Sequence, residues 1–271
     1  MANEPSTADN GPMPNIDSTV PHSARIWNYW LGGKDNYEVD RIAGDQFRAA
    51  FPGIPANARA FRYFLSRAIT YLAAEAGVRQ FLDIGTGLPT ADNTHETAQR
   101  VAPESRIVYV DNDPLVLTHA RALLTSAPEG ATDYLNADLH DRDAIFAAAA
   151  KTLDFSRPVA LILSGILGHV ADLDEARAIV RGLMDQLPSG SYLLVCDGSD
   201  TNEVLNEAQR MHNANGQVQY HLRSPQQIAS YFEELELVEP GVVSCPLWRP
   251  ATTPFGEPAE VDAYGGVGRK S

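Results

Sequence analysis

A glycine-rich turn is the feature of the sequence that points most directly to chemistry. It reads Asp83-Ile-Gly85-Thr86-Gly87 and ends a short apolar run that begins at residue 80. Glycine lets the backbone come close to a ligand, and an acidic side chain in front of the glycines suits a ligand with a positive charge, such as an ammonium group. A tight turn without any ligand would also account for the glycines, so the turn alone does not decide its role.

Carboxylates also end the next two predicted strands. Asp111 is followed by Asn112, and Asp138 by Leu139. A carboxylate at the end of the second strand can accept hydrogen bonds from both hydroxyl groups of a ribose. At the end of the third strand it can accept one from an adenine amino group, while the next backbone amide meets a ring nitrogen. Each acid alone could be a helix cap or a surface turn, but three in succession predict a nucleoside site.

Two nucleoside ligands would fit such a site differently. A dinucleotide site is typical of G-x-G-x-x-G, and this sequence has Thr90 where the third glycine would stand. An adenosine with an ammonium group near Asp83 describes S-adenosylmethionine, which leaves S-adenosylhomocysteine after methyl transfer. We therefore expect a methyltransferase that binds S-adenosylmethionine. A non-catalytic module that binds the same ligand is the first alternative, and a NAD-dependent oxidoreductase the second.

The elements that would position these residues alternate between strands and helices, which predicts an α/β fold with a mostly parallel, Rossmann-like sheet. The predicted strands cover residues 80–85, 106–111, 133–138, 158–165 and 191–197. The predicted helices cover residues 91–101, 113–126, 141–151, 173–187, 201–213 and 224–235. Two more strands, near 241–247 and 261–268, follow one another without a helix and predict an antiparallel hairpin at the sheet edge.

The N-terminal part of the chain has a different character. Residues 1–20 are polar and rich in Pro, which predicts a disordered tail. Residues 21–76 predict a helical cap or lid, with two short helices broken at Gly32-Gly33 and a longer helix over 57–76. Residues 77–271 would then form the ligand-binding domain.

The predicted cap carries candidate substrate-side residues. Its aromatic faces could attract a sulfonium cation and surround the acceptor, although packing of the cap onto the sheet would explain the same residues. These aromatic residues are Trp27, Tyr29, Trp30 and Tyr37. In the loop that follows the glycine pair, Lys34 could meet the carboxylate of the ligand, and Asn36 could line the same site.

Three further residues are candidates for the site. Ser164 ends the fourth strand and is expected beside the cofactor. His169 follows that strand and could act as a general base. His169 and Tyr37 are the weak candidates for a catalytic residue. For His169, a polar histidine on the surface is the simpler interpretation. Arg59 could reach the ligand carboxylate, although it and its helix neighbours Arg62 and Arg67 read as a solvated face.

Composition excludes several other classes. The 21 basic and 35 acidic residues leave a net charge of −14, which argues against a nucleic-acid surface. The only cysteines, Cys196 and Cys245, provide neither a disulfide framework nor a CxxC metal site. No apolar run is long enough for a membrane span, and the N-terminus is unlike a signal peptide. We expect a cytoplasmic enzyme with a small-molecule substrate, no metal and no membrane partner; the sequence does not predict an oligomeric state.

Several stretches resemble the actinobacterial S-adenosyl methyltransferases of the DUF574 type, within the class I methyltransferases. They are RIWNYWLGGKDNYEVDR, NARAFRYFLSRA, QFLDIGTGLPT, HETAQRVAPESRIVYVDNDPLVLTHARALL and AYGGVGRK, and the resemblance spans roughly residues 16–270. It implies a seven-stranded sheet with an antiparallel last strand. It also implies that Asp83, Gly85, Gly87, Asp111 and Asp138 bind the cofactor, and it supplies no acceptor.

The sequence departs from the pattern of this family after the fourth strand. It reads LILSGILGHV, where such proteins often place His directly after a Leu and an aromatic residue next. The resemblance therefore does not extend to a role for His169.

Overall fold

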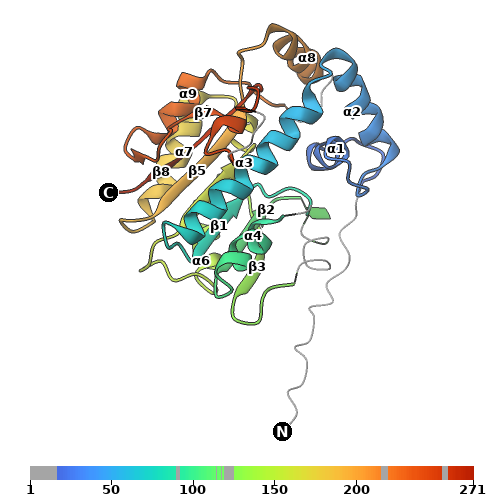
Figure 1. Cartoon of the computed structure of the whole chain (residues 1–271). Helices are drawn as coiled ribbons and strands as arrows, with labels where there is room; N and C mark the ends of the chain where they lie inside the picture. Colours follow the sequence, from blue (N-terminus) through green and yellow to red (C-terminus); the bar gives the residue numbers. More distant parts are fainter. Residues whose placement is uncertain are drawn as a thin grey trace.

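The computed structural model describes residues 17–89, 92–113, 115, 116, 118, 125–214, 219–251 and 256–271. Most of the predicted tail and most of the predicted helix over 113–126 lie outside these residues. Within them, the five predicted parallel strands are present and pair in one sheet (Figure 1). They are β1 (Gln80–Ile84), β2 (Arg106–Asp111), β3 (Ala131–Asn136), β4 (Ala160–Ser164) and β5 (Tyr192–Gly198).

The last two predicted strands pair antiparallel, as the sequence predicts, and together they extend the sheet beyond β5. The order in the sheet is β3-β2-β1-β4-β5-β8-β6, so that β8 (Ala263–Arg269) is inserted antiparallel between β5 and two short strands. These are β6 (Glu236–Leu237) and β7 (Val243–Ser244), and both pair with β8. The predicted strand over 241–247 shrinks because Cys245-Pro246 turns into the 3₁₀ helix η3 (Cys245–Leu247). The described sheet thus has eight strands, and its antiparallel strand is an inner one.

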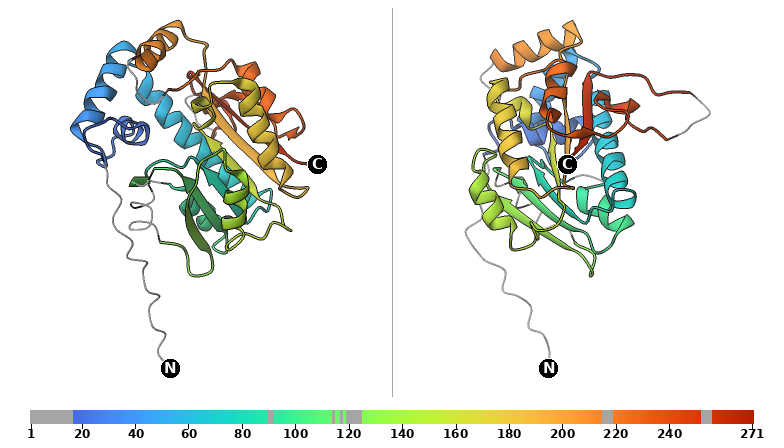
Figure 2. Two further views of the ribbon diagram at one scale, coloured as in Figure 1. Left: turned by 180° about the vertical axis from the view of Figure 1, so that it is seen from behind. Right: turned by 90° about the vertical axis from the view of Figure 1, so that its left-hand side faces the viewer.

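Helices cover both faces of the sheet, as the buried apolar strands predict (Figure 2). One face carries α3 (Ile54–Ala74) and α4 (Thr94–Val101). The other carries α6 (Arg142–Ala149), α7 (Leu173–Asp185) and α9 (Pro225–Ala229), which continues into η2 (Ser230–Phe232). The helix predicted over 224–235 is therefore split in two. Among the described residues no helix combines the length and the apolar character that a membrane span requires.

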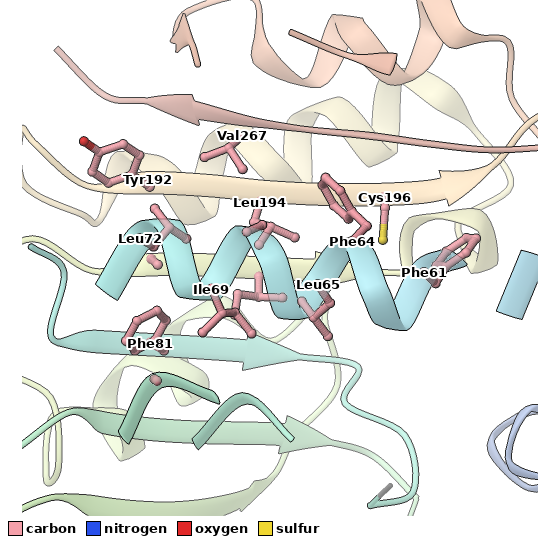
Figure 3. Packing of buried hydrophobic residues seen from close by; sticks show 14 of the residues in the cluster. Phe61, Phe64, Leu65, Ile69, Leu72, Phe81, Tyr192, Leu194, Cys196 and Val267 are labelled. Atoms are coloured by element: carbon pink, nitrogen blue, oxygen red, sulfur yellow. The ribbon is translucent and has the colours of Figure 1, made fainter. Parts of the chain in front are cut away.

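The long helix α3 ties the cap to the sheet. Its apolar residues recur at helical spacing, and Figure 3 shows Phe64, Leu65, Ile69 and Leu72 against the strands below. At the other end of the helix, Phe61 meets the Trp27 ring edge-on at 5.2 Å. Because α3 belongs to the core of the sheet and also contacts α1, burial of its apolar face fixes where the cap can lie.

The cap has the predicted two helices and a glycine break. These are α1 (Ser23–Trp30) and α2 (Glu38–Ala50), and α2 also lies against α8 (Glu203–Ala214) (Figure 1). The intervening loop is wrapped around the buried Asn28, whose Oδ1 accepts hydrogen bonds from the Asp35 amide and the Asn36 side chain. A Cβ on Gly33 would lie 2.4 Å from the Asn28 side chain. Packing inside the loop thus requires glycine at position 33, and a φ angle of 82° favours glycine at position 32.

A buried ion pair holds the cap together. Arg25 and Asp40 are 4% and 0% exposed and lie 2.9 Å apart (Nε to Oδ2). Asp40 also accepts from the backbone amides of His22 and Tyr37, so it joins the start of α1 to the start of α2. Breaking such a pair leaves an uncompensated charge in the interior.

Asp40→Asn should therefore lower the free energy of unfolding by about 3 kcal/mol, because the Arg25 charge stays buried without its partner. Asp45→Asn is the matched control: Asp45 is exposed and accepts only from the Tyr29 hydroxyl, so its loss should change stability by less than about 0.5 kcal/mol. Urea unfolding measures both. Equal effects of the two substitutions would contradict the role given to the pair.

Candidate functional site

The glycine turn lies between the end of β2 and the segment that follows β4. Gly85 and Gly87 have φ angles of 76° and 64°, and the Gly85 amide donates to the Val110 carbonyl at 2.8 Å. A Cβ on Gly85 would lie 2.7 Å from Ile166. The turn therefore needs glycine both for its backbone conformation and for this close approach. It leads out of β1 at the carboxyl-end edge of the sheet, where ligands bind in folds of this kind.

Asp111 connects the end of β2 to this turn. Its Oδ2 accepts from the Gly87 amide at 3.0 Å, and its Oδ1 accepts from the Asp113 amide at 2.9 Å. Burial raises the pKa of Asp111, and its two amide donors act in the opposite direction. Each carboxylate oxygen keeps a lone pair after these bonds. The half-buried side chain can thus still accept from two hydroxyl groups.

The structure also brings together the predicted residues at the ends of β2 and β3. The side-chain amide of Asn112 donates to Asp138 at 3.1 Å. Asp138 also accepts from the backbone amide of His140 at 2.9 Å. This backbone bond, with one from the His140 ring, lowers the pKa of Asp138. Asp138 is exposed, whereas Leu139 is buried and lines a cavity of about 320 Å³ between α6 and α7.

Asp83 is the most strongly perturbed acid of the turn. Its side chain is 4% exposed and accepts from the Thr94 hydroxyl at 2.6 Å. Burial raises its pKa to about 6, and the Thr94 bond and the Arg62 charge reduce that rise. A carboxylate held in the interior with so little compensation is typical of a functional site.

Sequence reasoning missed the partners of Asp83 and misjudged the arginines of α3. Arg62 is half-buried and close enough to stabilise the Asp83 charge, whereas Arg59 is exposed. Arg67 is not on a solvated face either, because it donates to the carbonyls of Trp248 and Cys245. The three arginines have the same helix environment in the sequence, and only the packed structure distinguishes them.

The predicted aromatic residues of the cap make contacts that packing alone would explain. The Trp27 ring meets Trp30 edge-on at 5.8 Å. The Trp30 indole donates to the Gly44 carbonyl, and the Tyr29 hydroxyl donates to Asp45 at 2.8 Å. The two hydrogen bonds join α1 to α2, whereas the Trp27–Trp30 contact lies within α1.

The three predicted residues of the loop between α1 and α2 have unlike surroundings. Asn36 donates to the Gly33 carbonyl within the loop. Tyr37 is 39% exposed, with the Arg25 guanidinium 5.2 Å from its ring centroid. Lys34 is exposed.

His22, which the sequence analysis did not single out, brings the cap onto the site. Its Nδ1 lies 3.1 Å from Asp113 Oδ2, directly after the Asp111-Asn112 pair. Next to it, Ala24 of α1 packs against the small apolar cluster to which Leu88 of the glycine loop belongs. The start of α1 therefore covers the place where the turn of β1 meets the end of β2.

Two predicted residues follow β4. The Ser164 hydroxyl lies 3.1 Å from the Cys196 thiol of the neighbouring β5. His169 belongs to the 3₁₀ helix η1 (Leu167–His169), and its ring Nδ1 lies 2.8 Å from the Gln219 carbonyl. Over the part of the chain that the structure describes, no group of three or more His, Cys, Asp or Glu side chains is arranged to hold a metal ion.

Comparison with known proteins now identifies the family. The sequence model of the S-adenosyl methyltransferases matches residues 9–271. The chain belongs to this family. A DUF574 protein from Streptomyces avermitilis MA-4680 superposes with a TM-score of 0.90 at 46% identity, over 95% of this chain and 100% of that one. A candidate methyltransferase from Thermobifida fusca YX gives 0.84 at 40% identity, over 96% and 98%.

The family settles the main functional prediction. The chain is an S-adenosylmethionine-dependent methyltransferase with the Rossmann-like class I fold, as its motifs indicate. Mitomycin 7-O-methyltransferase MmcR shares the fold, with a TM-score of 0.50 at 17% identity over 91% of this chain and 68% of that one. No protein with a curated description matches the sequence.

The burial of Asp83 predicts that this residue lowers the stability of the ligand-free protein at neutral pH, while its charge serves ligand binding. The pKa of Asp83 lies near 6 in the folded chain against 3.8 for the free side chain, so the native state keeps a proton that the unfolded state loses between these values. Wild-type protein should therefore lose up to about 3 kcal/mol of stability relative to Asp83→Asn as the pH rises through this window.

Thermal unfolding without ligand at pH 4 and pH 7.5 measures this difference. Asp83→Asn should be the more stable protein at pH 7.5 and nearly equal to wild type at pH 4. Asp185→Asn, at an exposed position of α7, should follow wild type at both. A variant that is less stable than wild type at pH 7.5 would contradict the argument.

Proposed function

We propose that S-adenosylmethionine binds along the carboxyl-end edge of the sheet through the predicted residues. Asp111 would accept from the ribose hydroxyl groups, Asp138 and the Leu139 amide would meet the adenine, and the Gly85-Gly87 turn would lie against the methionine moiety. The observation that carries this proposal is Asp111, which is fixed by the amides of Gly87 and Asp113 and keeps lone pairs for further donors.

The amino-acid end of the ligand fits the charges around Asp83. An ammonium group there would supply the counter-charge that the buried carboxylate lacks. Arg62, whose charge already acts on Asp83, is placed to meet the ligand carboxylate, and a planar guanidinium suits that partner. The exposed Lys34 is a second candidate for the same group. Thr90, the residue that argued against a dinucleotide, lies outside the described residues.

The acceptor is proposed to be a small molecule that reacts beneath the cap. The start of α1 contacts Asp113 through His22, and Ala24 packs against the apolar cluster that contains Leu88, so the cap covers the neighbourhood of the ligand. The net charge of −14 disfavours a nucleic-acid acceptor. The division into a cap over 21–76 and a donor-binding part over 77–271 stays a prediction, since α3 packs into the sheet core.

Little covalent work is needed from the protein in this reaction. The sulfonium supplies an already activated methyl group. The chain's own residues hold donor and acceptor in line at about 3 Å, and such alignment can provide much of the acceleration. An acceptor that keeps a proton on its reacting atom needs a base as well.

Asp111→Asn should weaken binding of S-adenosylhomocysteine about 10- to 100-fold, because it removes the charged acceptor for the ribose hydroxyls. Isothermal titration measures the affinity, and Asp185→Asn should bind as wild type does. Thermal unfolding of each variant shows whether the glycine turn survives. Wild-type protein that binds NAD but not S-adenosylhomocysteine, or an unchanged affinity in Asp111→Asn, would refute the proposed site.

Methyl transfer from labelled S-adenosylmethionine distinguishes an enzyme from a binding module. Wild-type protein should label at least one compound in a panel of small hydroxyl, amine and thiol compounds. Label found only in nucleic acid would contradict the proposed acceptor class.

A further inference from the structure

The segment after β4 is held more firmly than a surface connection requires. Arg223 is 3% exposed and donates to the carbonyls of Leu167 at 2.7 Å and of Val170. The Gly168 carbonyl accepts from the His221 amide at 2.7 Å. Three carbonyls around His169 are thus bound by one segment of the chain, residues 221–223. A 3₁₀ turn clamped in this way fixes the direction of its side chains.

The His169 ring is itself oriented. A backbone carbonyl only accepts, so the contact of 2.8 Å to Gln219 requires that the ring nitrogen Nδ1 carries the proton. The ring also meets the Tyr220 ring edge-on, with centroids 5.2 Å apart. A neutral imidazole protonated at Nδ1 presents a basic lone pair at Nε2. Among the described residues, no hydrogen-bond partner lies at Nε2.

Tyr220 is fixed by a buried acid at the end of β5. Its hydroxyl donates to Asp197 at 2.6 Å and accepts from the Gly198 amide at 3.2 Å. Asp197 is 1% exposed, and its second oxygen has no hydrogen-bond partner within the described structure. A Cβ on Gly168 would lie 2.3 Å from the Tyr220 ring, so the glycine before His169 is what admits this ring.

His22 connects this arrangement to the proposed donor site. It is close enough to both Asp111 and His169 for its charge to lower their pKa values. His22 itself contacts Asp113. In addition Ile166, three residues before His169, touches the glycine turn at Gly85. His169 thus lies at the same edge of the sheet as the proposed ribose site.

We propose that His169 is the general base of the methyl transfer, that Tyr220 and Asp197 position it, and that the acceptor is a hydroxyl compound such as a phenol. This inference rests on the proposed function. A free amine is nucleophilic once it has lost its proton to solvent, whereas a hydroxyl group must lose its proton as the new bond forms. A positioned base is therefore of most use to an oxygen acceptor.

The reaction balances without any further reagent. The hydroxyl proton passes to His169 Nε2, and an oxygen lone pair forms the C–O bond to the methyl carbon. The S–C bond breaks with its electron pair going to sulfur, which gives the methyl ether and S-adenosylhomocysteine. The imidazolium then returns its proton to solvent.

The surroundings of His169 lower its pKa on balance. Burial is the main cause, the hydrogen bond to the Gln219 carbonyl acts in the opposite direction, and the charges of His22 and His221 lower the pKa further. His212 of α8 is close enough to feel the charge of His169 in turn. Because its pKa lies below the usual 6.5, the imidazole is available as a base at neutral pH. The rate of methyl transfer should fall as the pH drops through this lowered pKa of His169.

Two measurements test the proposal, and the first needs no acceptor. In protein labelled with ¹⁵N-histidine and saturated with S-adenosylhomocysteine, long-range ¹H–¹⁵N spectra at pH 7.5 should show His169 protonated at Nδ1 and free at Nε2. His169→Gln assigns the signal. An imidazolium, or a ring protonated at Nε2, would overturn the inference. Failure of S-adenosylhomocysteine to bind would instead refute the proposed function.

The second measurement is methyl transfer to a panel of phenols, alcohols, amines and thiols. His169→Gln should lower kcat at least about 100-fold for a hydroxyl acceptor, with binding of S-adenosylhomocysteine unchanged and the acidic limb of the pH profile lost. Tyr220→Phe should lower kcat less and keep that limb. Asp185→Asn, at an exposed position of α7, should act as wild type does. Transfer restricted to thiols or amines, or equal rates in wild type and His169→Gln, would overturn the inference.

Discussion

The desolvated charge of Asp83 is the constraint around which the site is arranged. An acid at the end of a buried strand costs free energy unless hydrogen bonds or an opposite charge compensate it. In this chain the compensation comes from the Thr94 hydroxyl and the partly buried Arg62, and it leaves the pKa at about 6. The fold thus holds a poorly compensated negative charge beside a glycine turn. A cationic ligand would neutralise this charge, which is a reason for the fold to retain a buried carboxylate that lowers its stability.

Two buried arginines give the surroundings of this charge their rigidity. Arg25 pairs with Asp40 and so fixes the two cap helices to each other. Arg223 binds the carbonyls on both sides of η1 and so fixes the segment after β4. Each guanidinium donates several hydrogen bonds to backbone carbonyls or to one carboxylate. Lysine has a single ammonium group and is poorly suited to this role. The cap and the segment after β4, where we propose that the acceptor reacts, are therefore positioned by separate hydrogen-bond networks.

The sequence predicted the parts of this molecule that depend on local pattern. Strand ends carry their acids at β1, β2 and β3, and the alternation of apolar runs with amphipathic stretches located the parallel strands. Contacts between distant segments were beyond such reasoning. Nothing local distinguishes Arg62 from Arg59, or predicts that Asn28 is the centre of the loop at Gly33. The pairing of β8 with β5 was beyond such reasoning as well, because strand order depends on contacts between distant segments and not on closeness in sequence.

The order of residues after β4 has a physical explanation in the same terms. Leu167 is followed by Gly168 and then by His169. The Tyr220 ring lies where any side chain at 168 would begin, at 2.3 Å from the Cβ position. An aromatic ring supplied by a distant segment thus excludes a side chain at 168, and the imidazole stands one position later. The Tyr220 ring therefore both excludes a side chain at position 168 and contacts the His169 ring, so that any side chain at 168 would displace the ring that packs on the imidazole.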